Sequence, residues 1–380
     1  MIDRARMMSS TTSDDPPARR DDLRAGDRLD RIGAWLVEHV TPDWSAARFT
    51  ALARTSGGVS YETWIVDAED PADPQDRRAR FVLRRQPLRG PVEPYDVLGE
   101  AAVYAGLADT GVPVPRVLGT CADLAVAGRP FAVLEYIDGE VPDYRTLMQR
   151  DEWIDPARRA NMARQFMGVL GAAQRVDWRR FERFAALASG PRPREPERLH
   201  ALIEHMLATA AHRMADWVPH PIFRDAARWC QEHAPDGDPD DMVLIHGDFK
   251  VGNFIWRDER IVAFLDWEGA MVGDPLQDLG YACHPAMREP RPDLMAMLAP
   301  LDDLIAYYEA ASERTVDRRR LHYYVVYALL FHTWTLTIGL PSIAEWDGDM
   351  RMATGYKKLN QVTRLLTAQI EAYEAGRGVL

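Results

Sequence analysis

The chain has few cysteines and no long apolar run, and these absences exclude several classes of protein. Only three of its 380 residues are cysteine, too few for a disulfide framework or a zinc cluster, and an odd number favours a reducing cytoplasm. No stretch reaches the roughly 18 consecutive apolar residues of a membrane span. The N-terminus lacks the apolar core of a signal peptide. The sequence therefore predicts a cytoplasmic protein without a membrane span.

Positive charge is also scarce, and nearly all of it is arginine. Lys and Arg total 46 against 58 for Asp and Glu, a formal net charge of −12, and the only lysines are Lys250, Lys357 and Lys358. A chain this acidic lacks the basic stripe that a nucleic-acid binder needs. The acidic excess slightly favours a cationic small molecule as ligand, whereas an acidic ligand would need a metal or local arginines.

The overall composition, with 47% apolar and 27% charged residues, is typical of a folded protein. Residues 1–26 are polar without an apolar period and predict a mobile leader. The rest is first rich in strand patterns and then in helix patterns. We therefore expect an α+β fold in two lobes, a small β-rich lobe over residues 27–137 and a larger helical lobe over 138–380.

Local patterns predict the individual elements. In the small lobe we expect strands at 49–53, 61–66, 80–84, 116–121 and 130–137, separated at 67–76 by an Asp/Pro run, and helices at 30–40 and 93–110. In the larger lobe a short strand cluster at 242–266 interrupts helices expected at 155–175, 194–214, 221–233, 296–312, 317–337 and 350–374.

The sharpest signal is a pair of apolar strands that each end in a carboxylate. The first delivers Asp248 in a His-Gly-Asp triplet, Asn253 follows five residues later, and the second strand ends in Asp266. Oxygen ligands of this kind, completed by phosphate oxygens and water, suit Mg²⁺. Asp248 would remain free to accept a hydroxyl proton. The segment therefore predicts a metal-assisted phosphoryl-transfer site.

This segment resembles the aminoglycoside phosphotransferase and choline kinase family. The matching pattern is His246-Gly-Asp248-x4-Asn253 followed by Asp266-Trp-Glu268, which has the mechanics of the related protein-kinase motifs. Within the family the chain is most similar to the branch that includes kinase-like domains fused to some acyl-CoA dehydrogenases. The resemblance implies a bilobal protein-kinase-like fold with ATP in the cleft between the lobes and Mg²⁺ as its partner.

The same resemblance requires a phosphate-binding element in the small lobe. Gly57, Gly58 and Ser60 lie between two expected strands, where a phosphate-covering loop would be. The Gly57-Gly58 pair is also typical of an ordinary hairpin turn. Arginine stands where kinases have a strand lysine. Arg84 aligns with that lysine, and Arg85 should face the opposite side of the strand, so we favour Arg84 over Arg85. The alternative is that both arginines are solvated on an edge strand.

Further residues receive roles from the resemblance. Glu100, on the next helix among small apolar residues, is expected to pair with Arg84. The backbone of Glu135 and Ile137, at the end of a strand, is expected to pair with the adenine edge.

Polar residues around the motif have structural interpretations. His246 and Asp278 are expected to fix the catalytic loop, Asp278 by accepting backbone N–H bonds. Glu268 would either brace a metal ligand or touch substrate, and both interpretations stay open.

We therefore expect an ATP-dependent O-phosphotransferase that acts on a hydroxyl of a small molecule, such as an aminoglycoside. A kinase of a hydroxyacyl or lipid-type metabolite is one alternative, and a non-catalytic nucleotide-binding protein is the other, because the small lobe has no lysine. The acceptor is expected beside the late helices, among polar and aromatic residues that a plain core explains equally well: Arg319, Arg320, His322, Tyr323, Tyr324, Tyr327, His332, Trp334 and Glu345.

Overall fold

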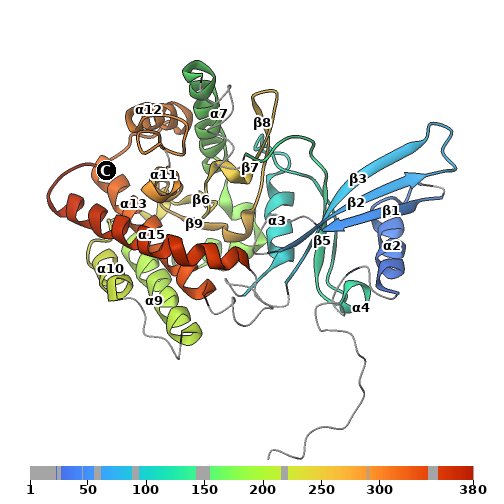
Figure 1. Cartoon of the computed structure of the whole chain (residues 1–380), viewed down its shortest axis with the longest axis horizontal. Helices are drawn as coiled ribbons and strands as arrows, with labels where there is room; N and C mark the ends of the chain where they lie inside the picture. Colours follow the sequence, from blue (N-terminus) through green and yellow to red (C-terminus); the bar gives the residue numbers. More distant parts are fainter. Residues whose placement is uncertain are drawn as a thin grey trace, which may run out of the picture.

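The computed structural model describes residues 23, 27–44, 46–54, 61–87, 94–142, 155–214, 221–288, 291–340 and 350–379. They form a small lobe built on a β-sheet and a larger lobe that is mostly helical (Figure 1). Most of the expected leader lies outside these residues, but Leu23 is described and is buried in the core of the small lobe. Among the described helices, none is long and apolar enough to cross a bilayer.

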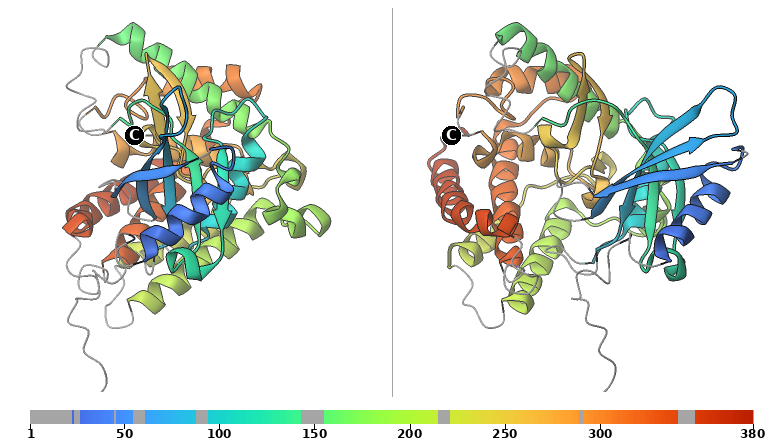
Figure 2. Two further views of the ribbon diagram at one scale, coloured as in Figure 1. Left: turned by 90° about the vertical axis from the view of Figure 1, so that its right-hand side faces the viewer. Right: turned by 45° about the vertical axis from the view of Figure 1, so that its right-hand side comes forward.

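The small lobe is a five-stranded antiparallel sheet in the order β1-β2-β3-β5-β4. Its strands are β1 (Arg48–Arg54), β2 (Glu62–Asp70), β3 (Arg77–Arg85), β4 (Val117–Cys121) and β5 (Phe131–Glu135). Helix α2 (Arg28–His39) and the short α4 (Leu124–Ala127) cover one face, and α3 (Val97–Leu107) lies on the side toward the large lobe (Figures 1 and 2). The run at 67–76 was expected to separate two strands, but β2 continues into it as far as Asp70.

Side chains of β3 alternate between the two faces of this sheet, as the strand repeat requires. Phe81 and Leu83 join the core under α2, whereas Val82 packs on the core shared with the large lobe. Arg85 therefore shares the face of Leu83, and Arg84 shares the face of Val82. β3 pairs with β2 on one side and β5 on the other. It is not an edge strand.

The large lobe surrounds two short antiparallel strand pairs with helices. The pairs are β6 (Val243–Ile245) with β9 (Met271–Gly273) and β7 (Phe254–Arg257) with β8 (Arg260–Phe264). The helices are α7 (Pro156–Gln174), α8 (Ala185–Ser189), α9 (Glu195–Arg213), α10 (Pro221–Glu232), α11 (Leu276–Cys283), α12 (Leu301–Ser312), α13 (Arg318–Gly339) and α15 (Met350–Glu374). Helix α13 is buried along most of its length because α9, α10, α11 and α15 all contact it.

One helix starts later than its apolar pattern predicts. A helix was expected from residue 296, but α12 begins at Leu301, after Pro300. Ala296 and Met297 have left-handed φ angles of 49° and 61°, which a right-handed helix excludes. The apolar residues before Pro300 are buried in a turn. The apolar pattern therefore predicted their burial correctly, but the helical conformation that it predicted for them is wrong.

Backbone contacts connect the lobes beside the short strand pairs. The N–H of Phe264, in β8, donates to the carbonyl of Pro113 at 2.6 Å, and Glu140 and Trp256 exchange two hydrogen bonds of 2.8 Å. These contacts hold β7 and the end of β8 at the junction of the two lobes, which Figure 2 shows from two further sides.

Candidate active site

The loop that follows β6 is held rigidly by two side chains. Asp278, on α11, accepts the backbone N–H of His246 at 2.8 Å and that of Gly247 at 2.9 Å. The His246 ring contacts the Leu265 carbonyl through Nε2 at 2.8 Å, and its Nδ1 accepts the N–H of Asp248 at 3.1 Å. Nδ1 thus acts as an acceptor, and Nε2 carries the proton. Both residues fix the loop, as the sequence predicted.

Burial is the main cause of the pKa shifts of His246 and Asp278. Burial lowers the pKa of His246, which keeps the ring neutral. Burial also raises the pKa of Asp278 to about 7, although the two backbone N–H donors oppose that rise.

Asp248 lies in a cluster of polar groups from its own loop. Asn253 donates from its amide nitrogen to the Asp248 carbonyl at 2.8 Å and to Oδ2 at 3.0 Å. Lys250 Nζ lies 2.5 Å from the same Oδ2. Burial acts to raise the pKa of Asp248, but the charge of Lys250 and the Tyr281 hydroxyl outweigh it, and the pKa is lowered. Asp248 is therefore a carboxylate at neutral pH.

Lys250 is one residue of this site that sequence reasoning missed. It lies inside the motif, two residues after Asp248, and it is one of only three lysines in the chain. That scarcity is the signal that could have found it.

Two side chains of the small lobe, Arg84 and Tyr104, reach Asp266. Arg84 Nη2 lies 2.9 Å from Asp266 Oδ1 and 3.1 Å from Glu100 Oε1, so one guanidinium joins the two carboxylates. The Tyr104 hydroxyl accepts the backbone N–H of Asp266 at 2.7 Å. Asp266 itself has a left-handed φ of 69°, a conformation that is rare outside glycine and concentrated at functional sites. Helix α3 thus holds Asp266 through Tyr104 directly and through the Glu100–Arg84 pair.

The Arg84–Glu100 pair is buried. Its side chains are 14% and 1% exposed. Burial raises the pKa of Glu100 to about 7, against the attraction of Arg84. For Arg84 burial acts to lower the pKa, but Glu100 and Asp266 outweigh it and raise the pKa. The alternative of two solvated edge-strand arginines is wrong, since β3 is central and Arg85 is 1% exposed.

Arg85 belongs to a different network on the opposite face of the sheet. Its Nε lies 2.9 Å from Glu62 Oε2, and its Nη1 donates to the Ala127 carbonyl at 2.9 Å. Arg129 donates to the other oxygen of Glu62 at 2.9 Å. This cluster links β2, β3 and α4 and does not reach Asp266.

The predicted nucleotide contacts are described only in part. Gly57, Gly58 and Ser60 lie outside the described residues. Glu135 ends β5, and its N–H donates to the Arg116 carbonyl at 2.9 Å. An adenine contact by Glu135 would therefore fall to its carbonyl. Ile137 lies two residues beyond the end of the strand.

The predicted metal ligands fit a cation that takes some of its coordinating oxygens from another molecule. In the ranges that the structure covers, no three His, Cys, Asp or Glu side chains cluster as a metal site. Both hydrogen bonds from the Asn253 amide use its nitrogen, which leaves the amide oxygen for a cation. Mg²⁺ is commonly held by one or two protein oxygens together with phosphate and water, and Asn253 with Asp266 matches that need.

Most residues expected to line an acceptor pocket are core or structural residues. The Tyr323 hydroxyl donates to the Cys230 carbonyl at 2.8 Å, the Tyr324 hydroxyl donates to Glu195 at 2.7 Å, and Arg320 pairs with Asp274. Glu345 lies outside the described residues.

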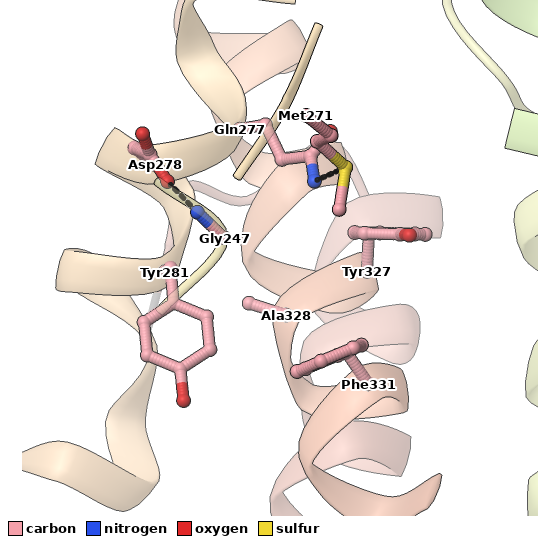
Figure 3. Close-up of a pocket in the computed structure, with 8 residues that line it drawn as sticks. All are labelled: Gly247, Met271, Gln277, Asp278, Tyr281, Tyr327, Ala328 and Phe331. Atoms are coloured by element: carbon pink, nitrogen blue, oxygen red, sulfur yellow. Dashed lines mark hydrogen bonds between the residues drawn. The ribbon is translucent and has the colours of Figure 1, made fainter. Parts of the chain in front are cut away.

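A small cavity opens behind the catalytic loop (Figure 3). Gly247, Tyr281, Tyr327 and Phe331 are among its lining residues, and its free volume is about 20 Å³. That volume admits a water molecule but no acceptor.

A five-stranded lobe joined to a helical lobe, with Asp248, Asn253 and Asp266 at their junction, defines a protein-kinase-like fold. The model of the phosphotransferase enzyme family matches residues 51–322, and the chain belongs to that family.

Relatives and solved structures agree with this assignment. The chain is 30% identical over 206 residues to acyl-CoA dehydrogenase family member 11 of Gallus gallus, a match that covers 53% of this chain and 25% of that protein. The chain thus spans about a quarter of that relative's length.

Two solved structures share the fold at low sequence identity. A protein of Ralstonia eutropha JMP134, described as a candidate aminoglycoside phosphotransferase, has a TM-score of 0.68 at 19% identity, over 90% of this chain and 98% of that one. An aminoglycoside phosphotransferase in a ternary complex with streptomycin and ATP has a TM-score of 0.53 at 12% identity, over 87% of this chain and 95% of that one.

Proposed function

We propose that the protein transfers the γ-phosphoryl group of ATP to a hydroxyl of a small molecule. The observation that carries this proposal is the convergence of groups from both lobes: Arg84 of the small lobe reaches Asp266, while Asn253 contacts Asp248. Membership of a phosphotransferase family supports the reaction class. A neighbour of the same fold that binds ATP supports the choice of donor.

Asp248 would act on the acceptor hydroxyl. The acceptor oxygen would bond to the γ-phosphorus as the bond from that phosphorus to ADP breaks, and the hydroxyl proton would pass to Asp248. The lowered pKa of Asp248 does not prevent this, because proton transfer is late in a loose transition state. Lys250 supplies a positive charge beside the carboxylate, where negative phosphoryl oxygens would arrive.

The remaining residues would bind the nucleotide and its metal. Asn253 and Asp266 would hold Mg²⁺, which would supply positive charge to the terminal phosphate oxygens. Arg84, positioned by Glu100, would bind phosphate: its Nε has no hydrogen-bond partner in the described part of the chain. The loop with Gly57, Gly58 and Ser60 would cover the phosphates, and the backbone of Glu135 and Ile137 would contact adenine.

The Asp248→Asn variant tests the proposal. We expect phosphoryl transfer to fall by about 10²–10⁴-fold, the usual contribution of a general base, while calorimetry shows that Mg–ATP still binds. Asp258→Asn is the matched control, because Asp258 is exposed in a turn with a φ of 50° that asparagine tolerates. Full turnover in Asp248→Asn would remove Asp248 from this role. Tight Mg–ATP binding without transfer to any acceptor would favour the non-catalytic alternative.

A further inference from the structure

Two histidines lie buried beside the candidate active site. His284 follows α11 and is 0% exposed, and His332 on α13 is 9% exposed. Their ring centroids are 5.3 Å apart. Neither ring nitrogen of His284, nor Nδ1 of His332, has a hydrogen-bond partner within the described ranges. A buried polar atom left unpaired costs about 1–3 kcal/mol, so these atoms are available to hydrogen-bond a molecule that reaches them.

One aromatic ring separates this pair from the candidate base. The Tyr281 ring meets the His284 ring edge to face at 5.2 Å between centroids. The Tyr281 hydroxyl, in turn, faces Asp248 closely enough to lower the pKa of that carboxyl. Asp248 and the histidine pair thus lie on either side of the Tyr281 ring.

The charges that face the pair are mainly positive. Burial, together with Lys250 and Lys358, lowers the pKa of both imidazoles, that of His332 to about 4. The carboxylate that acts on His332 is Asp248, which Lys250 already pairs with. Both rings are thus neutral hydrogen-bonding groups in a positive field.

Arg288 adds a buried positive charge for which the described residues provide no counter-ion. It is 2% exposed, and its Nε and Nη1 donate to the carbonyls of Cys283 and Pro292, each at 3.1 Å. In the part of the chain that the structure covers, its Nη2 has no hydrogen-bond partner and no carboxylate forms an ion pair with it. Arg288 contributes to the positive field at His284. An unpaired buried charge is costly, so this region favours an anion.

We propose that the acceptor is a hydroxy acid whose anionic oxygen group, a carboxylate in the simplest case, binds at His284 and His332 while its hydroxyl lies at Asp248. This inference rests on the proposed function and narrows its substrate class. The carboxylate accepts hydrogen bonds from the imidazoles and balances the positive field around them. An amino sugar or amino alcohol would place a cation in that field and is disfavoured. The local charges thus outweigh the acidic excess of the chain as a guide to the acceptor.

The first test compares acceptors that differ in one terminal group. Straight-chain hydroxy carboxylates, their primary amides and amino alcohols of equal length are assayed with the whole protein and Mg–ATP, and phosphorylated product is measured. We expect carboxylates to be favoured by about tenfold or more in kcat/KM, which corresponds to about 1.4 kcal/mol. Equal or better use of the amides or amino alcohols overturns the inference and leaves the proposed function standing.

The second test removes the subsite by mutation. His332→Gln should raise the KM for carboxylate acceptors about tenfold, and it should raise the KM for the matching amides by less. His200→Gln, at an exposed position of α9, is the matched control. Lys358→Gln, at a half-buried position, gives a second variant if His332→Gln does not fold. An unchanged carboxylate preference in the folded variants overturns the inference.

Binding separates this inference from the proposed function. If no compound is phosphorylated, the proposed function fails for these acceptors, and the same compounds are titrated by calorimetry in the presence of Mg–ADP. Carboxylate binding that His332→Gln weakens supports the subsite. Absence of carboxylate binding, or binding that His332→Gln leaves unchanged, overturns it.

Discussion

The two faces of the small-lobe sheet use neighbouring arginines for different purposes. Toward α2 and α4, Arg85 is enclosed and satisfied by Glu62 and the Ala127 carbonyl. Toward α3, Arg84 bridges Glu100 and Asp266 and keeps Nε without a partner among the described residues. An enclosed arginine with satisfied donors holds a fold together, whereas one that joins two lobes and retains a donor can still take a ligand.

The largest expected effect follows from removing Arg84, on the sheet face toward α3 and the large lobe, here called the cleft face. Arg84→Gln should lower kcat/KM for ATP by about 10²–10³-fold, because a preorganised donor to the transferred group is lost. Arg84→Lys should retain more activity, with a loss of about tenfold, since an ammonium cannot contact two carboxylates and a phosphate in the geometry of a guanidinium. Steady-state kinetics measure both, and urea denaturation shows whether stability changes.

Two results would contradict the assignment of Arg84 to ligand binding. Full activity in Arg84→Gln would mean that the guanidinium only ties Glu100 to Asp266. Activity lost only in proportion to lost stability would place Arg84 with Arg85 as a structural residue.

The next largest effect should appear on the opposite face, in stability. Arg85→Met leaves Glu62 with Arg129 as its remaining partner, and breaking a buried pair in this way costs about 3 kcal/mol. Activity per folded molecule should stay unchanged, because the network of Arg85 does not reach Asp266. Arg78→Met is the control: Arg78 lies on the same strand, is 67% exposed and pairs with Asp76. Activity loss like that of Arg84→Gln would show that the two faces are coupled.

The sequence could predict contacts that lie within one short segment. Asp248 and Asn253 are five residues apart, so their motif already specifies the contact between them. Gly247, in the same triplet, has a φ of 87°, and the Gly269 carbonyl lies where a side chain would be. The fold class followed from the order of strand and helix patterns and from the family resemblance.

Contacts between distant segments were harder to predict. Arg84 and Asp266 are 182 residues apart, and no periodicity relates them. The Arg84–Glu100 pair was expected from the resemblance and the alternation of a strand, and the structure contains it. The surroundings of His284 and His332 depend on how α11, α13 and α15 pack, which single-sequence patterns do not encode.

The smallest expected effect concerns the ring that packs against Arg84. The Arg84 guanidinium carbon lies 4.8 Å from the centroid of Tyr61, and the Tyr61 hydroxyl accepts the backbone N–H of Asp96 at 3.3 Å. Tyr61→Leu removes the cation–π contact and should raise the KM for ATP about threefold, within the range of about 0.5–2 kcal/mol for such contacts. Tyr61→Phe retains the ring and should leave this KM unchanged. Equal KM values in both variants would show that Glu100 and Asp266 alone orient Arg84, and the cleft face would then depend on charge pairs as completely as the Arg85 face does.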